Sequence, residues 1–160
     1  MRIEDIPASD IRRYKLGWLI RAKTIDADVE IKNGKVVWKD GIWKKGTWED
    51  GIWLGGLWED GTWKKGIWHD GRWEKGRWKG GLWKKGRWII GLHEFGTWED
   101  GEWFGGLWKD GLWEKGTWFG GWWDNGRWED RRNLRPDKRT DYSNAKIASD
   151  LLRIAKQLTN

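Results

Sequence analysis

A tryptophan recurs at every fifth position between Trp38 and Trp128, and this spacing limits what the chain can fold into. Steps of five from 38 to 128 give 19 positions, and 18 of them hold tryptophan while His93 holds the other. From Gly41 onward a glycine stands two residues before each of these positions, so the unit is Gly-x-Trp-x-x. A five-residue period does not match a helix, which would also lose about 1 kcal/mol for each glycine. The repeat therefore predicts a mainly β, elongated structure in which stacked units share one core.

The tryptophans of this row are expected to be structural, because each indole can bury roughly 200 Å². The row comprises Trp38, Trp43, Trp48, Trp53, Trp58, Trp63, Trp68, Trp73, Trp78, Trp83, Trp88, Trp98, Trp103, Trp108, Trp113, Trp118, Trp123 and Trp128. Alternation along a strand sends the tryptophans to one face and their neighbours to the other. The tryptophan face is therefore either the core or a binding surface.

Two stackings of the unit fit this pattern. In an antiparallel meander, x-Trp-x forms a three-residue strand and the next two residues form a hairpin turn. Asp-Gly and Asn-Gly favour the type I′ turn, because both central residues need positive φ. The segment from Trp48 to Trp53, with its turn at Asp50-Gly51, resembles the designed tryptophan-zipper hairpins. Cross-strand aromatic pairs of this kind contribute about 0.5 to 1.5 kcal/mol beyond burial.

The residues before the glycines alternate with a period of ten, as an antiparallel ladder with two kinds of turn requires. Aspartate occupies this place at Asp40, Asp50, Asp60, Asp70, Asp100 and Asp110. None of the turns between them has aspartate; they hold lysine, glycine, phenylalanine or asparagine instead.

In the second stacking, each pentad forms one side of a parallel β-solenoid. A glycine followed two residues later by a large residue, as in Gly61 and Trp63, resembles the pentapeptide-repeat family. That resemblance implies a four-sided β-solenoid with four pentads in each coil. A flattened coil of two pentads also tolerates the alternation. The pattern resembles, more weakly, the Trp- and Gly-containing hairpins of MORN repeats.

The start of the repeat favours the antiparallel meander over the four-sided parallel solenoid. Residues 29–38 alternate between apolar and polar on either side of Asn33-Gly34, which predicts two strands around a type I′ turn. In this hairpin Ile31 lies opposite Val36.

Four regions follow from these patterns: an N-terminal cap at 1–28, the repeat domain at 29–130, a basic linker at 131–142 and a C-terminal amphipathic helix at 143–160. Short capping helices are expected at both ends. In the N-terminal cap, Ser9 or Asp10 can N-cap a helix for which Gly17 provides the C′ position.

The C-terminal helix is predicted from an apolar stripe that follows a possible N-cap at Ser143. Its possible partner-binding residues are Ile147, Leu151, Ile154 and Leu158. Such a helix is expected to cap the repeat, to pair with a copy of itself or to dock on a larger assembly.

Positive charge is concentrated in the tail. Residues 38–130 carry 15 Lys and Arg against 16 Asp and Glu, whereas residues 131–160 carry 8 against 3. The possible phosphate-binding residues are Arg131, Arg132, Arg135, Lys138 and Arg139. Arg-rich arms contact nucleic-acid phosphates, so a nucleic-acid partner is one alternative.

One stretch of the repeat has large apolar residues at positions where other pentads have charged residues. The stretch runs from Trp88 through Ile89, Ile90, Leu92 and His93 to Phe95. This change predicts either a fold-over between two sheets or a local contact site.

The sequence offers no set of residues for catalysis, and we expect a protein that is not an enzyme and uses no cofactor or metal. There is no cysteine, and the two histidines, His69 and His93, lie far apart in the repeat. No apolar run is long enough for a membrane helix, and no signal-peptide pattern opens the chain. We therefore expect no membrane partner and a cytoplasmic location, or a virion if the chain is phage-encoded.

Chains in which this Trp-Gly pentad runs through most of the sequence resemble uncharacterised proteins met in tailed-phage and environmental bacterial sequences. The leading hypothesis is a non-enzymatic structural or interaction protein, a rigid Trp-cored scaffold with a protein partner or self-association. A phage virion or assembly component would fit this role. The first alternative is a carbohydrate-binding module that uses an exposed tryptophan row, and the second is nucleic-acid binding through the basic tail.

Overall fold

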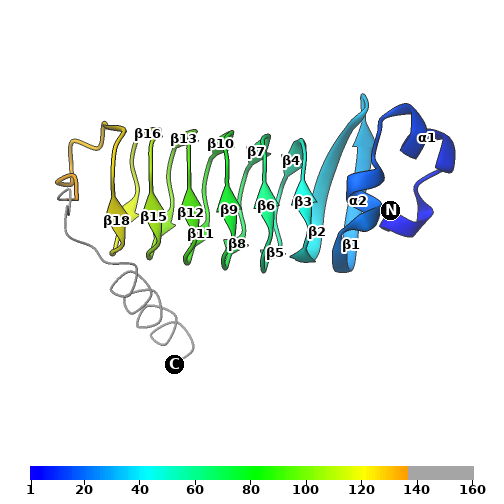
Figure 1. Ribbon diagram of the computed structural model, residues 1–160, viewed down its shortest axis with the longest axis horizontal. Coiled ribbons are helices and arrows are strands. Elements are labelled where there is room, and N and C mark those ends of the chain that lie inside the picture. Colours follow the sequence, from blue (N-terminus) through cyan, green and yellow to red (C-terminus); the bar gives the residue numbers. More distant parts are fainter. Residues whose placement is uncertain (137–160) are drawn as a thin grey trace.

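The computed structural model describes residues 1–136 and shows a rod of stacked coils with helices at one end (Figure 1). The chain begins with the 3-10 helix η1 (Ile3–Asp5), the helices α1 (Ala8–Arg13) and α2 (Gly17–Arg21), and the long strands β1 (Lys23–Lys32) and β2 (Lys35–Lys45). The other strands are β3 (Thr47–Trp48), β4 (Gly51–Trp53), β5 (Leu57–Trp58), β6 (Thr62–Trp63), β7 (Ile67–Trp68), β8 (Arg72–Trp73), β9 (Arg77–Trp78), β10 (Leu82–Trp83), β11 (Arg87–Trp88), β12 (Leu92–His93), β13 (Thr97–Trp98), β14 (Glu102–Trp103), β15 (Leu107–Trp108), β16 (Leu112–Trp113), β17 (Thr117–Trp118), β18 (Trp122–Trp123) and β19 (Arg127–Trp128).

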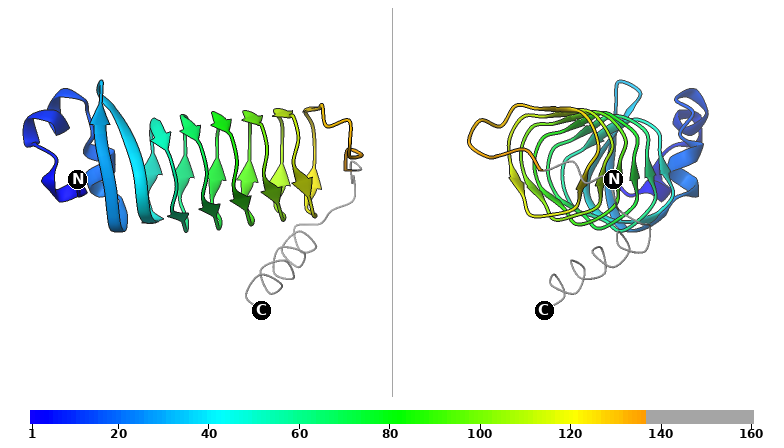
Figure 2. Two further views of the ribbon diagram at one scale, coloured as in Figure 1. Left: turned by 180° about the vertical axis from the view of Figure 1, so that it is seen from behind. Right: turned by 60° about the vertical axis from the view of Figure 1, so that its left-hand side comes forward.

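The repeat is a parallel β-solenoid in which three pentads make one coil. Trp53 pairs in register with Trp68, and Trp68 with Trp83, so neighbours along the rod are three pentads apart in the sequence. The solenoid has about six turns, which the right-hand view of Figure 2 shows one behind another. At the usual strand spacing the repeat is roughly 30 Å long.

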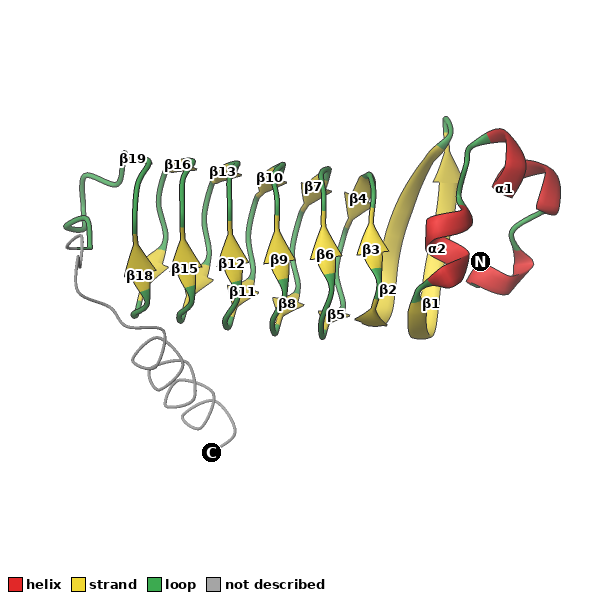
Figure 3. Ribbon diagram, in the orientation of Figure 1, coloured by secondary structure: helices red, strands yellow, loops and turns green. Residues whose placement is uncertain are grey.

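The three sides of the solenoid are three columns of strands (Figure 3). The first side contains the start of β2 followed by β4, β7, β10, β13, β16 and β19; the second contains the end of β2 followed by β5, β8, β11, β14 and β17; the third contains β3, β6, β9, β12, β15 and β18. Because β2 runs across two sides, the first and second sides belong to one 13-stranded sheet, while the third is a 6-stranded sheet.

Glycine is required at the corners because the chain turns there with positive φ against the backbone of the previous coil. At Gly61 φ is 129°, and a Cβ atom would lie 2.2 Å from the carbonyl oxygen of Gly46. The same contact lets the amide of Thr62 donate to that carbonyl at 3.0 Å. The glycine of the unit therefore permits the close approach that joins successive coils.

The antiparallel meander that the sequence favoured is wrong for the repeat, and the reason lies in the turns. A type I′ turn needs positive φ at both central residues. Within residues 1–136, only Lys15, Asp26 and Asn33 have positive φ without being glycine. Asn33-Gly34 is thus the one Asx-Gly pair with this geometry, and there β1 and β2 do form the predicted antiparallel hairpin with Ile31 opposite Val36.

The alternative, a parallel solenoid, is confirmed, but it has three sides where the pentapeptide-repeat resemblance implied four. The coil of three pentads also explains the alternation of the corner residues. Aspartate tends to precede the corner glycine in every second pentad, whereas neighbouring coils are three pentads apart. A corner with aspartate therefore lies beside a corner without aspartate in the next coil. Asp50 therefore faces Lys65 in the next coil, and Asp60 faces Lys75.

The N-terminal end of the solenoid is covered by β1 and α2. Strand β1 lies along β2, with Val29 opposite Trp38 and Thr24 beside Trp43. The indole of Trp18 in α2 packs edge to face on Trp48, with ring centroids 5.1 Å apart. Strand β1 and helix α2 therefore cover all three tryptophan stacks at this end.

The cap helices differ in detail from the prediction. Ser9 and Asp10 lie inside α1, whose N-cap is Pro7, and Gly17 begins α2 where we expected it to end a helix. The left-handed residue after α1 is Lys15, with a φ of 56°. The helix predicted at 143–160 lies outside the described residues.

The bulky stretch between Trp88 and Phe95 is not a fold-over. Strands β11, β12 and β13 continue the second, third and first sides without a break in register. The stretch changes the surface instead: Ile89 is buried on the outside of the coil, and Phe95 is exposed.

Candidate functional site

The tryptophan row forms three stacks in the interior of the solenoid. Along a side the rings lie face to face, as with Trp38 and Trp53, whose centroids are 4.7 Å apart and whose planes differ by 6°. Between sides they meet edge to face, as with Trp38 and Trp43 at 5.9 Å. These are the two arrangements that aromatic rings prefer. All members of the row are buried except Trp118 and Trp128 in the last coil, which are partly exposed.

The indole nitrogens point toward the corners of the next coil. Trp88 donates from Nε1 to the carbonyl oxygen of Gly105 at 3.1 Å. A Cβ atom on Gly116 would lie 3.1 Å from Nε1 of Trp98, which is a second reason for glycine at the corners. Most other buried indole nitrogens have no hydrogen-bond partner in residues 1–136. The core is thus held together by ring packing, with little polar bonding.

His93 replaces tryptophan in the stack of the third side. Its imidazole is fully buried, and neither ring nitrogen has a hydrogen-bond partner in the described part of the chain. Burial lowers the pKa of His93 to about 3, against a smaller opposing effect of the backbone at Asp110. The side chain is therefore neutral at pH 7. It is sealed inside the core, which leaves it no access to a substrate.

The outer surface carries charges that pair from coil to coil. Lys64 and Glu49 on the third side form an ion pair of 2.8 Å between Nζ and Oε2. Further pairs between residues three pentads apart are Lys35–Asp50, Lys44–Glu59, Lys65–Asp50, Lys75–Asp60, Arg87–Glu102 and Lys115–Asp100. These charges largely balance one another, so the sides carry no strong field of one sign.

The corner aspartates have a second role in the backbone. Asp40, Asp60, Asp70, Asp100 and Asp110 each accept a hydrogen bond from the amide of the glycine that follows, at 2.7 to 2.8 Å. An aspartate side chain that binds a neighbouring amide favours a local turn. Aspartate at a corner therefore stabilises the bend as well as the ladder of ion pairs.

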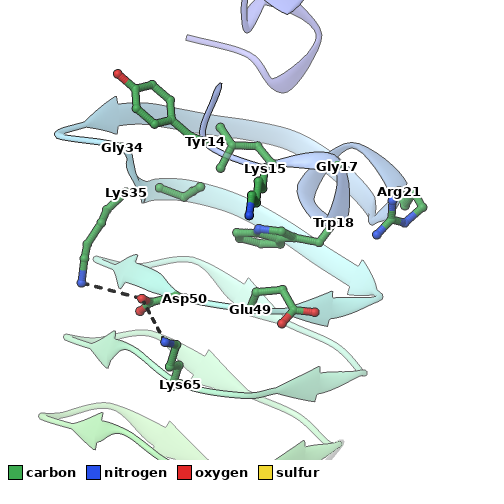
Figure 4. A pocket seen from close by; sticks show the side chains of 12 residues that line it. Tyr14, Lys15, Gly17, Trp18, Arg21, Gly34, Lys35, Glu49, Asp50 and Lys65 are labelled. Atoms are coloured by element: carbon green, nitrogen blue, oxygen red, sulfur yellow. Dashed lines mark ion pairs between the residues drawn. The ribbon is translucent and has the colours of Figure 1, made fainter. Parts of the chain in front are cut away.

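A cleft of about 650 Å³ lies between the N-terminal cap and the first coils (Figure 4). Trp18 lies at its centre, with Lys15 and Arg21 from the cap beside it. Asp50 on the facing wall forms ion pairs with both Lys35 and Lys65, each at 3.7 Å. The cleft is wide and polar, and the carboxylate of Asp50 in it is paired with two lysines.

An aromatic pair stands on the outside of the second side. The rings of Phe104 and Phe119 stack with centroids 4.7 Å apart, and the guanidinium of Arg87 lies 6.0 Å from the centre of the Phe104 ring. Phe119 is 59% exposed. This pair is the outward counterpart of the tryptophan stacks inside.

The predicted phosphate-binding residues fall partly outside the described residues. Arg131, Arg132 and Arg135 are exposed and follow the last coil, whereas Lys138 and Arg139 lie beyond residue 136. Arg132 forms an ion pair of 3.6 Å with Asp130. The phosphate site therefore stays a prediction. The possible partner-binding residues Ile147, Leu151, Ile154 and Leu158 also lie beyond residue 136.

Sequence reasoning missed the contacts at the C-terminal end of the solenoid. The buried carboxylate of Asp130 accepts hydrogen bonds from the amide of Arg132 and the side chain of Asn133. Burial raises the pKa of Asp130, but these hydrogen bonds, together with the charge of Arg132 and the backbone of Gly116, outweigh it, and the net pKa lies below the usual value. The signal was the end of the glycine series, where Arg131 stands in the place of a corner glycine.

Within residues 1–136 no group of three His, Cys, Asp or Glu side chains is placed to hold a metal ion. None of the helices in that range is long and apolar enough to span a membrane. Comparison with protein-family models, with curated proteins and with solved structures finds no match for this chain.

Proposed function

We propose that this chain is a non-enzymatic structural protein, a short rigid rod that holds the segments at its two ends at a fixed distance and orientation. The observation that carries the proposal is the burial of the tryptophan row. Indoles that contact a ring on both faces and along their edges, as Trp68 and Trp83 do, present no face to a ligand. Their role is then to maintain the shape of the rod.

The surface supports the same proposal. Its charges pair between coils, as in Lys64 with Glu49, and the cleft beside the N-terminal cap is wide and open to solvent. Exposed ion pairs contribute little to stability, about 0 to 1 kcal/mol each. They do keep a protein with a tryptophan core soluble and keep the sides of separate rods from adhering. Such a rod suits a component of a larger assembly, for which a phage virion is one setting.

Spin-label distances test the rigidity of the rod, and the absence of cysteine makes the labelling simple. Three residues on the outside of the first side suit the labels: Lys39, Glu99 and Glu114. Glu99 lies four coils beyond Lys39, and Glu114 lies five coils beyond it. Two double-cysteine variants, Lys39→Cys with Glu99→Cys and Lys39→Cys with Glu114→Cys, should give narrow distance distributions. Their maxima should differ by one coil, about 4.8 Å. Broad distributions, or a difference far from one coil, would show that the chain is not a rigid rod.

Tryptophan fluorescence tests the two alternatives. A structural core predicts blue-shifted emission, poor quenching by acrylamide and no response to polysaccharides or to single-stranded DNA. A shift on adding polysaccharide would support a carbohydrate-binding module instead. Salt-sensitive binding of DNA that the double variant Arg131→Ser and Arg135→Ser loses would support the basic tail as a nucleic-acid site.

A further inference from the structure

The cleft beside the N-terminal cap has an excess of positive charge. Four cationic side chains and two carboxylates line it: Lys15, Arg21, Lys35, Lys65, Glu49 and Asp50. Asp50 forms ion pairs with Lys35 and Lys65, and Glu49 forms one with Lys64. By contrast, the side chains of Lys15 and Arg21 form no ion pair with any other residue in 1–136. The cleft can therefore accept two further negative charges.

Trp18 provides the apolar part of the cleft. Its indole packs edge to face on Trp48, yet it remains partly exposed. Figure 4 shows Lys15 and Arg21 on either side of this indole. A second cleft of about 300 Å³ shares Trp18 and Arg21 with the first. Small-molecule sites usually enclose most of their ligand, so this open surface around Trp18 suits an extended segment better.

The backbone holds the two unpaired cations in place. Lys15 has a φ of 56°, a left-handed conformation that lysine rarely adopts. Such residues persist where the surrounding structure holds them, often at binding sites. Here the ring of Tyr14 packs on Gly34, where an added Cβ atom would lie 2.8 Å from the ring. The guanidinium of Arg21 lies over Gly17, where an added Cβ atom would be 3.1 Å from Nη1.

We propose that this cleft binds an acidic segment of a partner protein. Two carboxylates of the segment pair with Lys15 and Arg21, and an apolar side chain between them packs on Trp18. A guanidinium can hold a carboxylate with two parallel hydrogen bonds, which gives the contact at Arg21 a defined geometry. The excess of two positive charges in the cleft matches the two carboxylates.

The two acidic residues of the cleft favour a polypeptide over a nucleic acid. Glu49 and Asp50 are partly exposed, and they would repel a strand that carries a phosphate at every nucleotide. A polypeptide carries its charges singly. Its backbone N–H groups can also donate hydrogen bonds to the oxygens of Glu49 and Asp50.

Such a site would attach the N-terminal end of the proposed rod to an assembly, and in this sense it rests on the proposed function. Peptide binding and the spin-label distances are independent measurements. A flexible chain could still bind the peptide, and a rigid rod could fail to bind it, so the two failures are distinguishable.

A peptide titration of the full-length, ¹⁵N-labelled protein tests the site. The probe is the peptide Glu-Glu-Phe-Glu-Glu, blocked at both ends. We expect saturable shifts of the indole Nε1–H signal of Trp18 and of the amides of Lys15 and Arg21, with a Kd in the millimolar range. Signals of Trp113 and Trp128 at the other end should not move.

Two control peptides separate the contributions of charge and ring. Replacing the four glutamates with glutamine should abolish the shifts. Replacing the phenylalanine with serine should weaken binding roughly two- to tenfold, because the contact with the indole of Trp18 is lost.

Three variants of the protein complete the test. Lys15→Asn, which fits the left-handed backbone, and Arg21→Gln should each weaken binding about two- to fivefold, as expected for exposed ion pairs. The matched change Lys85→Asn, at an exposed corner outside the cleft, should leave the Kd unchanged. The melting temperature of Lys15→Asn should not fall, so its weaker binding cannot result from unfolding.

Several outcomes would overturn the proposal. One is the absence of shifts around Trp18, or shifts confined to the basic residues 131–135. Another is a glutamine peptide that binds as well as the glutamate peptide, or binding that the Lys15 and Arg21 variants leave unchanged. Tighter binding of single-stranded oligothymidylate or of polygalacturonate at Trp18 would identify a nucleic acid or an acidic polysaccharide as the occupant instead.

Discussion

His93 lies 3.8 Å from Trp108 between ring centroids but 6.2 Å from Trp78, although both neighbours are stacked with it. Elsewhere on the same side Trp63 and Trp78 are 4.9 Å apart. The smaller imidazole therefore packs closely on one neighbour only. It also introduces two unpaired ring nitrogens into a core that otherwise holds indoles.

Replacing His93 with tryptophan should stabilise the protein by roughly 1 to 3 kcal/mol. The indole restores the contact with Trp78 and removes an unpaired buried acceptor, in a rotamer that every coil already uses. Urea unfolding measures the change in the free energy of unfolding. The control His69→Trp, at a partly exposed outer position, should stay within about 0.5 kcal/mol of the parent. A destabilised His93→Trp protein would show that the core at this coil has adapted to the smaller ring.

Stability should fall as the solution is acidified below the ordinary pKa of histidine. Burial lowers the pKa of His93 from 6.5 to about 3, so between these values the unfolded chain binds the proton and the folded chain does not. Above about pH 6.5 the titration of His93 does not change the free energy of unfolding. On acidification below that pH, the free energy of unfolding falls by up to about 1.4 kcal/mol for each pH unit. His93→Trp lacks this term, so its advantage over the parent should grow between about pH 7 and pH 5. Parallel stability curves for the two proteins would contradict the buried, neutral histidine.

Gly61→Ala should cost roughly 2 to 4 kcal/mol, because alanine disfavours the corner φ and its Cβ would meet the carbonyl oxygen of Gly46. Gly80→Ala is the matched control. Gly80 precedes a corner, has no positive φ, and a Cβ there would lie 3.8 Å from its nearest neighbour. This control should be neutral or stabilise by up to about 1 kcal/mol. Thermal unfolding of both variants measures the difference, and equal effects would argue against close packing at the corners.

Asp50→Asn should cost at most about 1 kcal/mol, and the loss should disappear in about 1 M salt. Asp50 is paired with Lys35 and Lys65, but all three side chains are at least one-third exposed. Glu114→Gln serves as the control, since Glu114 forms no ion pair in residues 1–136. Unfolding in low and high salt measures both. A large loss at Asp50 that salt does not change would mean that the aspartate acts mainly through the backbone.

The sequence predicted the repeating unit and a structural tryptophan row, but it left open whether the row is the core or a binding surface, and it did not show how the units pair. Gly-x-Trp-x-x specifies a corner and an inward ring, and both are local properties. The number of pentads in a coil depends on the packing of indoles across the interior, where three large rings such as Trp38, Trp43 and Trp48 meet edge to face. A smaller inward residue would suit a different number of sides.

The pairing of units depends on packing across the interior, and this also explains why the alternation of aspartates was misinterpreted. Asp-Gly predicts a hairpin only if the aspartate takes positive φ, as Asn33 does and Asp60 does not. The useful signal was the recurrence of opposite charge at a separation of three pentads, as in Lys64 and Glu49. At the C-terminal end, Asp130 and Asn133 carry no pattern of their own, and only the end of the repeat marks them.

Because every side of the solenoid has the same unit, the chain can change length in small steps without redesign of its interior. Adding three pentads would extend the rod by one coil and leave the far end facing the same way. Adding one pentad would lengthen it by a third of a coil and turn everything beyond the insertion to the next side. Because the three sides of a coil are equivalent, the number of pentads sets both the length of the rod and the direction in which its far end faces.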